Sequence, residues 1–205
     1  MNVSARLLSH SLVYRTWQAP FAARKFAPIR AHNDLRTVRR VLDVGCGPGT
    51  NTANFARSDY LGIDLNPEYI ADARRRHARD FVVADVTTYS VESTAPFDFI
   101  LVNSLLHHIP TPGVRRLLSH LATLLSPDGC IHILDLVLPD HASLGRLMAR
   151  WDRGDFPRPA DTWRALFAES FDPVLIEPYG LGLAGVTLWN MIYFKGRRRA
   201  TAAAG

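Results

Sequence analysis

Three glycines alternate with other residues directly after a short apolar run, in the stretch VLDVGCGPGT from Val41 to Thr50. Because glycine has no Cβ, Gly45, Gly47 and Gly49 would let the main chain pass close beneath a bound molecule. A helix that starts near Thr50 would add free N–H groups for an anionic group. The glycine spacing departs from the dinucleotide fingerprint, and no P-loop lysine follows it. The stretch therefore predicts a ligand-binding turn of another kind.

Three aspartates lie at or near the ends of successive predicted strands. Asp64 follows the first glycine by about twenty residues, where a carboxylate can accept hydrogen bonds from two ribose hydroxyls. Asp85 ends the next strand and can take the amino group of an adenine. Asp43 precedes the glycine loop, and a carboxylate there suits an ammonium better than a phosphate. Together these groups predict a binding site for an adenosine that carries an amino-acid arm. S-adenosylmethionine fits this description.

Two adjacent histidines, His107 and His108, follow a later predicted strand and are candidates for a general base. The pKa of imidazole suits proton transfer at neutral pH. Such a base is needed only where the acceptor carries a proton that must leave. The alternative is that both histidines pack or hydrogen-bond structurally. Neither His132 nor His141 has a metal-ligand spacing with them, so the sequence predicts no metal site.

An acceptor molecule is expected to contact the least regular parts of the chain, namely the N-terminal segment, residues 140–171 and the loop 179–185. These parts are rich in aromatic side chains, which suit a small apolar or aromatic molecule. Most of these side chains are equally suited to packing in a protein core. The candidates for acceptor contact are Tyr14, Trp17, Phe21, Trp151 and Tyr179.

Strands and helices must alternate to bring these groups together, and the chain shows this alternation from Val41 onward. Its strand candidates are near-continuous apolar runs, as a parallel sheet with helices on both faces requires. Asn66 and Pro67 provide the expected N-cap and first residue of one helix. The predicted strands cover residues 41–45, 60–65, 81–86, 97–103 and 130–138, and the predicted helices cover 50–56, 67–78 and 111–129.

The two ends of the chain differ from this alternation. Residues 140–171 predict two helices interrupted at 154–159, which could form a lid. Residues 173–180 and 187–196 then predict two strands, paired as an antiparallel hairpin at the sheet edge. Residues 1–38 predict a helical cap, although the basic, acid-free composition of the first 33 residues also resembles an organelle transit peptide.

Composition sets the broad class. With 205 residues, 47% hydrophobic and 21% charged, the chain predicts one globular domain, 1–205. Cys46 and Cys130 are too few for a disulfide framework, which favours a reduced, cytoplasmic setting. No apolar run approaches the roughly 18 to 20 residues of a membrane helix. The net charge of +5 comes with basic clusters at 74–79, 114–116 and 196–200, which solvated helix faces and a basic tail explain better than a nucleic-acid site.

With these motifs the chain resembles the class I S-adenosylmethionine-dependent methyltransferases. VLDVGCGPG resembles the glycine-rich first motif of the family, GIDLN its ribose-binding strand end, and ADV its adenine-contact segment. FDFILVNSLLHHIP resembles the fourth strand and the loop that lines the methionine arm. The resemblance implies S-adenosylmethionine as cofactor and S-adenosylhomocysteine as product. It implies as cofactor-binding residues Asp43, Gly45, Cys46, Gly47, Gly49, Thr50, Asp64, Leu65, Asp85, Val86, Asn103, Ser104 and Leu105.

The family also implies a fold and a reaction. The expected fold is a doubly wound, Rossmann-like α/β domain with seven mostly parallel strands in the order 3-2-1-4-5-7-6, strand 7 being antiparallel. The expected reaction is methyl transfer to a small, apolar or aromatic molecule, because NSLL stands where nucleic-acid and glutamine methyltransferases of this family carry an NPPY-type segment. The alternatives are a nucleic-acid methyltransferase, RNA included, and a non-catalytic cofactor-binding partner subunit. The acceptor atom and the oligomeric state are left open.

Overall fold

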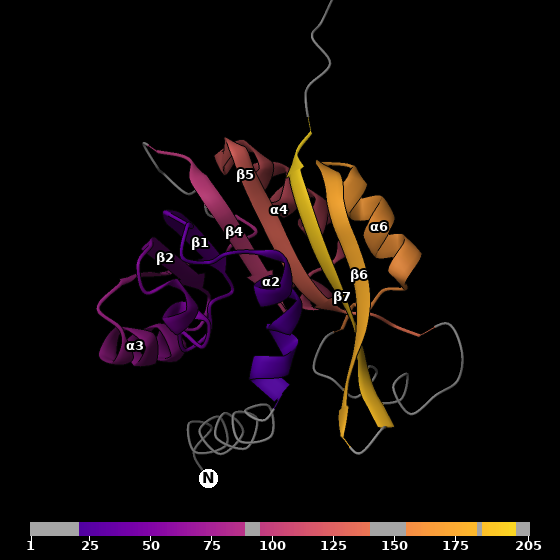
Figure 1. Ribbon diagram of the computed structural model, residues 1–205, viewed down its shortest axis with the longest axis horizontal. Coiled ribbons are helices and arrows are strands. Elements are labelled where there is room, and N and C mark those ends of the chain that lie inside the picture. Colours follow the sequence, from indigo (N-terminus) through magenta and orange to yellow (C-terminus); the bar gives the residue numbers. More distant parts are fainter. Residues whose placement is uncertain (1–20, 89–94, 140–154, 184–185, 200–205) are drawn as a thin grey trace, which may run out of the picture.

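The computed structural model describes residues 21–88, 95–139, 155–183 and 186–199 of the chain. One seven-stranded sheet in the order β3-β2-β1-β4-β5-β7-β6 forms its centre (Figure 1). Neighbouring strands from β3 to β5 are parallel, whereas β7 is antiparallel to both β5 and β6. The predicted order and the antiparallel strand are therefore confirmed. The strands are β1 Arg40–Val44, β2 Asp59–Asp64, β3 Asp80–Val83, β4 Phe97–Asn103, β5 Leu125–Leu136, β6 Phe171–Leu183 and β7 Val186–Arg198.

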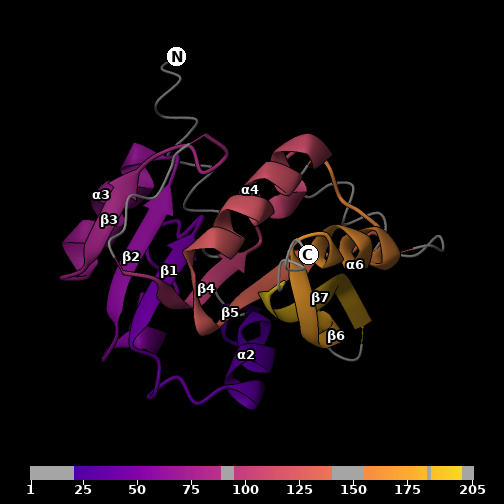
Figure 2. The ribbon, with the colours of Figure 1, turned by 90° about the horizontal axis from the view of Figure 1, so that it is seen from above.

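Helices cover the sheet from both sides, as its apolar strands require. Figure 2 shows α4 and α6 together on one side and α2 on the other. The start of α3 follows the predicted chemistry, because the Asn66 side chain accepts hydrogen bonds from the N–H groups of Glu68 and Tyr69, and Pro67 is its first residue. The α-helices are α2 Ala27–His32, α3 Pro67–Arg76, α4 Thr111–Leu124 and α6 Ala160–Ala168, and the 3-10 helices are η1 Thr52–Phe55 and η2 Leu106–His108.

Three buried apolar clusters hold these layers together. The largest joins the sheet to α4 and α6, with Leu118 and Trp163 fully buried in it. The second joins the other face to α2 and α3, through Ile29 and Ile70. A smaller third cluster contains Leu136, Leu181, Trp189 and Met191. It includes the last β5–β7 pair, Leu136 and Met191, beyond which β6 and β7 continue as a hairpin.

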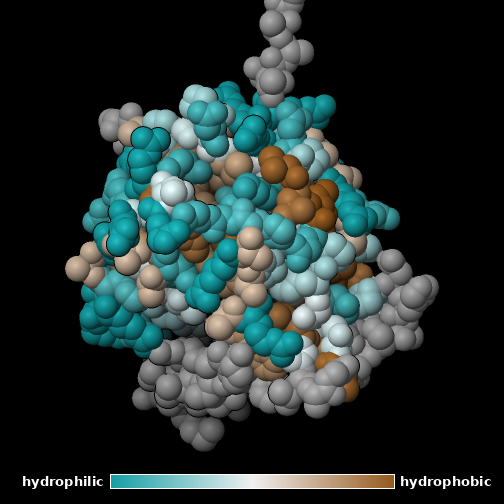
Figure 3. All heavy atoms as spheres, viewed as in Figure 1, coloured by the Kyte–Doolittle hydropathy of each residue, from teal (hydrophilic) through white to brown (hydrophobic). Residues whose placement is uncertain are grey.

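The sheet ends at β6, an edge strand whose outer hydrogen-bonding groups could recruit another chain. Pro173 and Pro178 interrupt the donors of this strand, and proline is tolerated at such an edge. Val174 on β6 is half exposed. Figure 3 shows a mainly hydrophilic face, with apolar atoms gathered over part of the β6–β7 region.

Several predicted boundaries were wrong. The short helix predicted over 50–56 is confined to the 3-10 helix η1, Thr52–Phe55, because the glycine turn continues to Asn51. Strand β3 ends at Val83, so Asp85 and Val86 lie in the following turn. Helix α4 ends at Leu124, and β5 begins at Leu125, where it pairs with Phe97.

The terminal and insert predictions are only partly covered by the structure. Residues 21–25 are helical and precede α2, in agreement with a helical cap, and residues 1–20 lie outside the described part. Helix α6 confirms the second predicted helix of the insert, whereas residues 140–154 also lie outside it, so the lid stays a prediction. Among the described residues, no helix is both long enough and apolar enough to cross a bilayer.

Candidate functional site

The turn after β1 takes the conformation for which glycine is required. Gly45, Gly47 and Gly49 have φ values of +75°, +54° and +77°, in the left-handed region that other residues rarely adopt. A Cβ at Gly45 would lie 3.1 Å from the Leu105 side chain, and one at Gly49 would lie 2.9 Å from the His77 ring. A Cβ at Gly47 would meet no atom within 4 Å. Gly47 is therefore the position at which this turn faces open space.

Asp64, at the end of β2, is tied directly to that glycine. One carboxylate oxygen accepts the Gly47 N–H at 2.8 Å, and the other accepts the Asn66 N–H at 2.9 Å. Each oxygen keeps a further lone pair, so the carboxylate can still accept hydrogen bonds from hydroxyl groups. Leu65 follows with 67% of its surface exposed. Two predicted residues thus meet beside the open face of Gly47.

Asp85 is an exposed carboxylate fixed by its own turn. It accepts hydrogen bonds from the Thr87 hydroxyl at 2.7 Å and the Thr87 N–H at 2.9 Å. These bonds hold the pKa of Asp85 below its usual value. Val86 is half-buried and packs against the largest apolar cluster. The structure therefore supplies an ionised acceptor two residues beyond β3.

Beneath the turn lies Asp43, which is fully buried. The Tyr60 hydroxyl donates to one of its oxygens at 2.6 Å, and the other oxygen, Oδ1, has no hydrogen-bond partner among the described residues. Burial raises the pKa of Asp43 to about 7, although the bond from Tyr60 acts in the opposite direction. An unsatisfied buried oxygen is unfavourable, and an ammonium group beside it would relieve this.

Two other predicted residues of the turn, Cys46 and Thr50, differ in burial. The Cys46 thiol is buried, and its burial raises the pKa of the thiol. Because only the thiolate is a strong nucleophile, Cys46 is a packing residue of the turn. Thr50 is exposed and precedes η1 by two residues, and η1 has no side-chain cap. The helix start lies at Thr52, two residues later than expected, and its role in binding an anion stays a prediction.

The last residue of β4, Asn103, and the loop that follows it bring Asn103, Ser104 and Leu105 to the same edge of the sheet. Ser104 has a φ of +55° and is the one non-glycine residue with positive φ in the described ranges. This backbone conformation costs about 1–2 kcal/mol and is often found at functional sites. The Ser104 N–H donates to the Leu134 carbonyl at 2.7 Å, which fixes the loop on β5. Leu105 in turn packs against Gly45.

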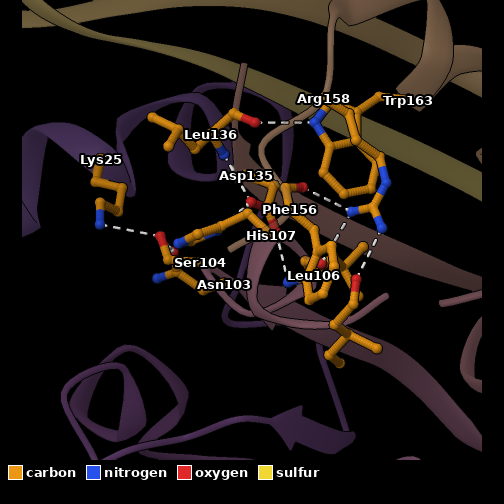
Figure 4. Close-up of polar contacts among 11 residues, drawn as sticks. Lys25, Asn103, Ser104, Leu106, His107, Asp135, Leu136, Phe156, Arg158 and Trp163 are labelled. Carbon is orange, nitrogen blue, oxygen red and sulfur yellow. Dashed lines mark hydrogen bonds and ion pairs between the residues drawn. The ribbon is translucent and has the colours of Figure 1, made fainter. Parts of the chain in front are cut away.

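Behind this loop, a buried polar network joins η2, β5 and the segment before α6 (Figure 4). Asp135, fully buried, lies 2.6 Å from Nδ1 of His107 and accepts the N–H groups of Leu106 and Leu136 at 2.8 and 2.7 Å. Burial alone would raise the pKa of Asp135, but His107 and these hydrogen bonds hold it below its usual value. His107 is thus buried and oriented, whereas its neighbour His108 is exposed.

Arg158 completes the network. Its guanidinium donates to the carbonyls of Leu106, Phe156 and Ile109, at 3.2, 3.0 and 2.7 Å, and stacks over the Trp163 ring at 4.7 Å. The sequence analysis missed both Asp135 and Arg158. Asp135 had a usable signal, since it is an acid at the end of an apolar strand. Arg158 had none, because Leu106 and Ile109, two of its three carbonyl partners, are about fifty positions away in the chain.

The N-terminal segment and the hairpin tip form the remaining side of this region. Phe21 packs edge-to-face on Trp189 with ring centroids 5.3 Å apart. The Tyr179 hydroxyl donates to the Lys25 carbonyl at 3.0 Å. Of the predicted acceptor contacts, Phe21 and Tyr179 are thus brought together, whereas Tyr14, Trp17 and Trp151 lie outside the described residues. Within the described ranges, no group of three or more His, Cys, Asp or Glu side chains could hold a metal ion.

Comparison with known proteins identifies related sequences. A methyltransferase-domain family model matches residues 41–129. A trans-aconitate 2-methyltransferase from Methylobacterium nodulans is 36% identical over 135 residues, which is 62% of this chain and 49% of that protein. One from Escherichia coli is 33% identical over 129 residues, covering 59% and 48% of the two chains. The chain therefore spans about half the length of the curated relatives it matches.

Two solved structures with the same fold are named as methyltransferases. N-methyltransferase NodS from Bradyrhizobium japonicum, in complex with S-adenosyl-L-homocysteine, has a TM-score of 0.64 at 18% identity and covers 80% of this chain and 79% of its own. Mitomycin 7-O-methyltransferase MmcR has a TM-score of 0.71 at 17% identity, covering 93% and 57%. At these identities the likeness concerns the fold. The strand order and the glycine turn agree with a methyltransferase domain of the kind that the family model matches over residues 41–129.

Proposed function

We propose that this protein transfers the methyl group of S-adenosylmethionine to a small-molecule acceptor. The observation that carries the proposal is the open face of Gly47 beside the Asp64 carboxylate. Gly47 leaves room for a ribose against the backbone, and the Asp64 carboxylate at the tip of the neighbouring strand can accept hydrogen bonds from its two hydroxyls. The bound cofactor supplies a methyl group on a sulfonium, a good leaving group.

Each described residue has a distinct part in holding the cofactor. Asp64 accepts the ribose hydroxyls, and Leu65 and Val86 pack against the adenine. Asp85 accepts the adenine amino group, and its lowered pKa keeps it ionised for this role. The unsatisfied oxygen of Asp43 favours the ammonium of the amino-acid arm. Asn103, Ser104 and Leu105 lie along that arm. In-line transfer then depends mainly on how well these groups align acceptor and donor.

For an acceptor that must lose a proton, we assign the base to His107 over His108. The bond between His107 Nδ1 and the low-pKa carboxylate of Asp135 makes Nδ1 the donor nitrogen, and Nε2 is then the nitrogen that can accept a proton. The same carboxylate would stabilise the imidazolium that forms. An acceptor that is already ionised needs no such step.

Two observations favour a small acceptor over a nucleic acid. The apolar cluster around Trp189 and the ring of Phe21 support an acceptor with an apolar part. The basic run 74–79 is largely engaged, since Arg75 and Arg76 pair with Asp72 and Arg74 donates to the Phe81 carbonyl. The names of the relatives add support for a small acid as one acceptor class.

The proposal is tested by calorimetry with S-adenosylhomocysteine, followed by methyl-transfer assays. Asp64→Ala should weaken binding by about 1–3 kcal/mol, because it strands polar groups. Asp172→Ala, on the exposed edge strand β6, is the matched control and should leave affinity unchanged. The assays use trans-aconitate, simple phenols and RNA as separate acceptors, and we expect transfer to a small molecule. Binding without transfer to any acceptor would favour a non-catalytic subunit, and transfer to RNA alone would overturn the small-molecule proposal.

A further inference from the structure

Lys25 reaches from the N-terminal segment to the loop that follows β4 (Figure 4). Its Nζ donates to the Ser104 hydroxyl at 3.0 Å, and this hydroxyl donates to the Asn103 side-chain carbonyl at 3.2 Å. Lys25 and Lys195 are the two lysines among the 24 basic residues of the chain, and the rest are arginines. Lys25 belongs to none of the motifs of the glycine turn or the strand ends. Lys25 is a half-buried residue, and its ammonium group is held at the edge of the sheet where the methyl transfer is proposed.

The backbone around Lys25 is fixed before any ligand arrives. The Lys25 carbonyl accepts the Tyr179 hydroxyl at 3.0 Å, and the Arg24 guanidinium donates to the Gly182 carbonyl at 2.6 Å. On the other side, Phe26 is buried and packs edge-to-face on Phe55 at 6.2 Å. These contacts tie the segment to the hairpin and to the core. A cation positioned in advance binds an anion with less loss of conformational freedom.

The surroundings of Lys25 match the charges of an amino-acid group. Ser104, whose hydroxyl accepts the hydrogen bond from the Lys25 ammonium, is followed by Leu105, which packs on Gly45 in the glycine turn. Asp43 lies in β1 just before that turn. The tips of β1 and β4 therefore present one carboxylate with a free oxygen and one ammonium. An amino-acid arm carries the complementary pair, an ammonium and a carboxylate.

We propose that Lys25 and Ser104 form a binding site for a carboxylate group. The inference rests on the proposed function, because that function brings an amino-acid arm, and an acid as a possible acceptor, to this edge. Lys25 supplies the charge, and the Ser104 hydroxyl can rotate to donate to the same carboxylate. Charge-assisted hydrogen bonds of this kind are about twice as strong as neutral ones. The carboxylate comes from the arm of the cofactor or from the acceptor, and the experiment separates the two sources.

The test compares two adenosine ligands by calorimetry on the full chain. S-adenosylhomocysteine carries the amino-acid arm, whereas 5′-methylthioadenosine lacks it. If the cofactor is the source, Lys25→Met weakens S-adenosylhomocysteine binding about tenfold or more and leaves 5′-methylthioadenosine binding unchanged. Lys25→Arg, which keeps the charge, should recover most of the loss. Lys195→Met on β7 is the control and should change neither affinity.

The second part of the experiment tests the acceptor as the source of the carboxylate. Trans-aconitate is the probe, and it is titrated into protein saturated with S-adenosylhomocysteine. If the acceptor is the source, Lys25→Met leaves both adenosine ligands unaffected and weakens the probe about tenfold or more. The Lys25 site would be overturned if Lys25→Met bound S-adenosylhomocysteine, trans-aconitate and 5′-methylthioadenosine all as tightly as the wild-type protein does. The proposed function would then still stand. A wild-type protein that binds neither adenosine ligand would overturn both.

A spectroscopic readout does not depend on affinity. Reductive methylation with carbon-13 keeps the charge of each lysine and gives one NMR signal for Lys25, one for Lys195 and one for any labelled N-terminal amine. The signal missing from labelled Lys25→Arg protein is that of Lys25. We expect S-adenosylhomocysteine or trans-aconitate to shift this signal and 5′-methylthioadenosine to leave it in place. A Lys25 signal that neither carboxylate ligand moves would contradict the proposal.

Discussion

The tips of β1 and β2 and the tips of β4 and β5 are held in place by different kinds of interaction. At β1 and β2, backbone groups and nearby carboxylates create the geometry within residues 43–66, as in the bond from Gly47 to Asp64. At β4 and β5, buried side chains from distant parts of the chain create it, as in the contacts of Asp135 and Arg158. The first region should therefore be sensitive to added atoms, and the second to removed partners.

The largest expected effect comes from removing a partner in the second region. Asp135→Ala leaves two buried N–H groups and His107 without their acceptor, and it should lower the free energy of unfolding by about 3–5 kcal/mol. Urea denaturation measures this loss. Asp161→Ala removes an exposed ion pair on α6 and should cost less than about 1 kcal/mol. Equal losses for the two variants would show that the network does not stabilise the fold.

Adding one methyl group to the glycine turn should weaken ligand binding at the tips of β1 and β2 with little loss of stability. Gly47→Ala places a Cβ in open space, so its stability cost is limited to the left-handed backbone, about 1–2 kcal/mol. It should weaken S-adenosylhomocysteine binding about a hundredfold, because the Cβ occupies the space of the ligand. Gly49→Ala, whose Cβ would meet the His77 ring, should lose more stability. Full affinity in Gly47→Ala would place the cofactor elsewhere.

Asp43 provides a pH test within the first region. Its pKa of about 7 in the folded protein exceeds the ordinary value of 3.8. Between these values the folded state keeps a proton that the unfolded state has lost, so this group makes the free energy of unfolding fall as pH rises. The slope is at most about 1.4 kcal/mol per pH unit. Asp43→Asn should remove this contribution in urea denaturation between pH 4 and 7.

Cofactor binding sharpens the same test. An ammonium group beside Asp43 favours its ionised form, so saturating S-adenosylhomocysteine should reduce the difference in slope between wild type and Asp43→Asn. The role of Asp43 would be contradicted if the free energy of unfolding of the two proteins changed with pH at the same slope, both with and without the ligand.

The smallest effect is expected at an exposed contact between α4 and α6. Arg115 lies 2.9 Å from the Glu169 carboxylate, and their side chains are 54% and 43% exposed. Arg115→Ala should change the free energy of unfolding by less than about 0.5 kcal/mol. Arg158→Ala, which strands three backbone carbonyls, should cost several times more. A large loss in Arg115→Ala would show that exposed pairs contribute more than this account allows.

This contrast also explains what could be predicted from the sequence. The strand order, the hairpin and the Asn66 cap were predictable because apolar runs and capping residues act locally. The glycine turn was predictable for the same reason, since its backbone strain needs glycine at particular positions. The end of β3 and the start of β5 were misplaced, because strand ends depend on pairing with neighbours such as Phe97.

The second region could not be predicted in the same way. Arg158 finds Leu106 and Ile109 about fifty positions away, and Lys25 finds Ser104 79 positions away. Neither residue lies in a periodic pattern or a motif, so only the folded chain shows what they contact. Asp135 could have been selected as an acid at a strand end, by the reasoning applied to Asp64.

The most direct test of the account is a crystal structure of the protein with S-adenosylhomocysteine. We predict that the two ribose hydroxyls lie within hydrogen-bonding distance of the Asp64 carboxylate, with the ligand passing over Gly47 and its arm directed toward the loop after β4. A ligand bound away from these strand tips, or a ribose without contact to Asp64, would contradict the account.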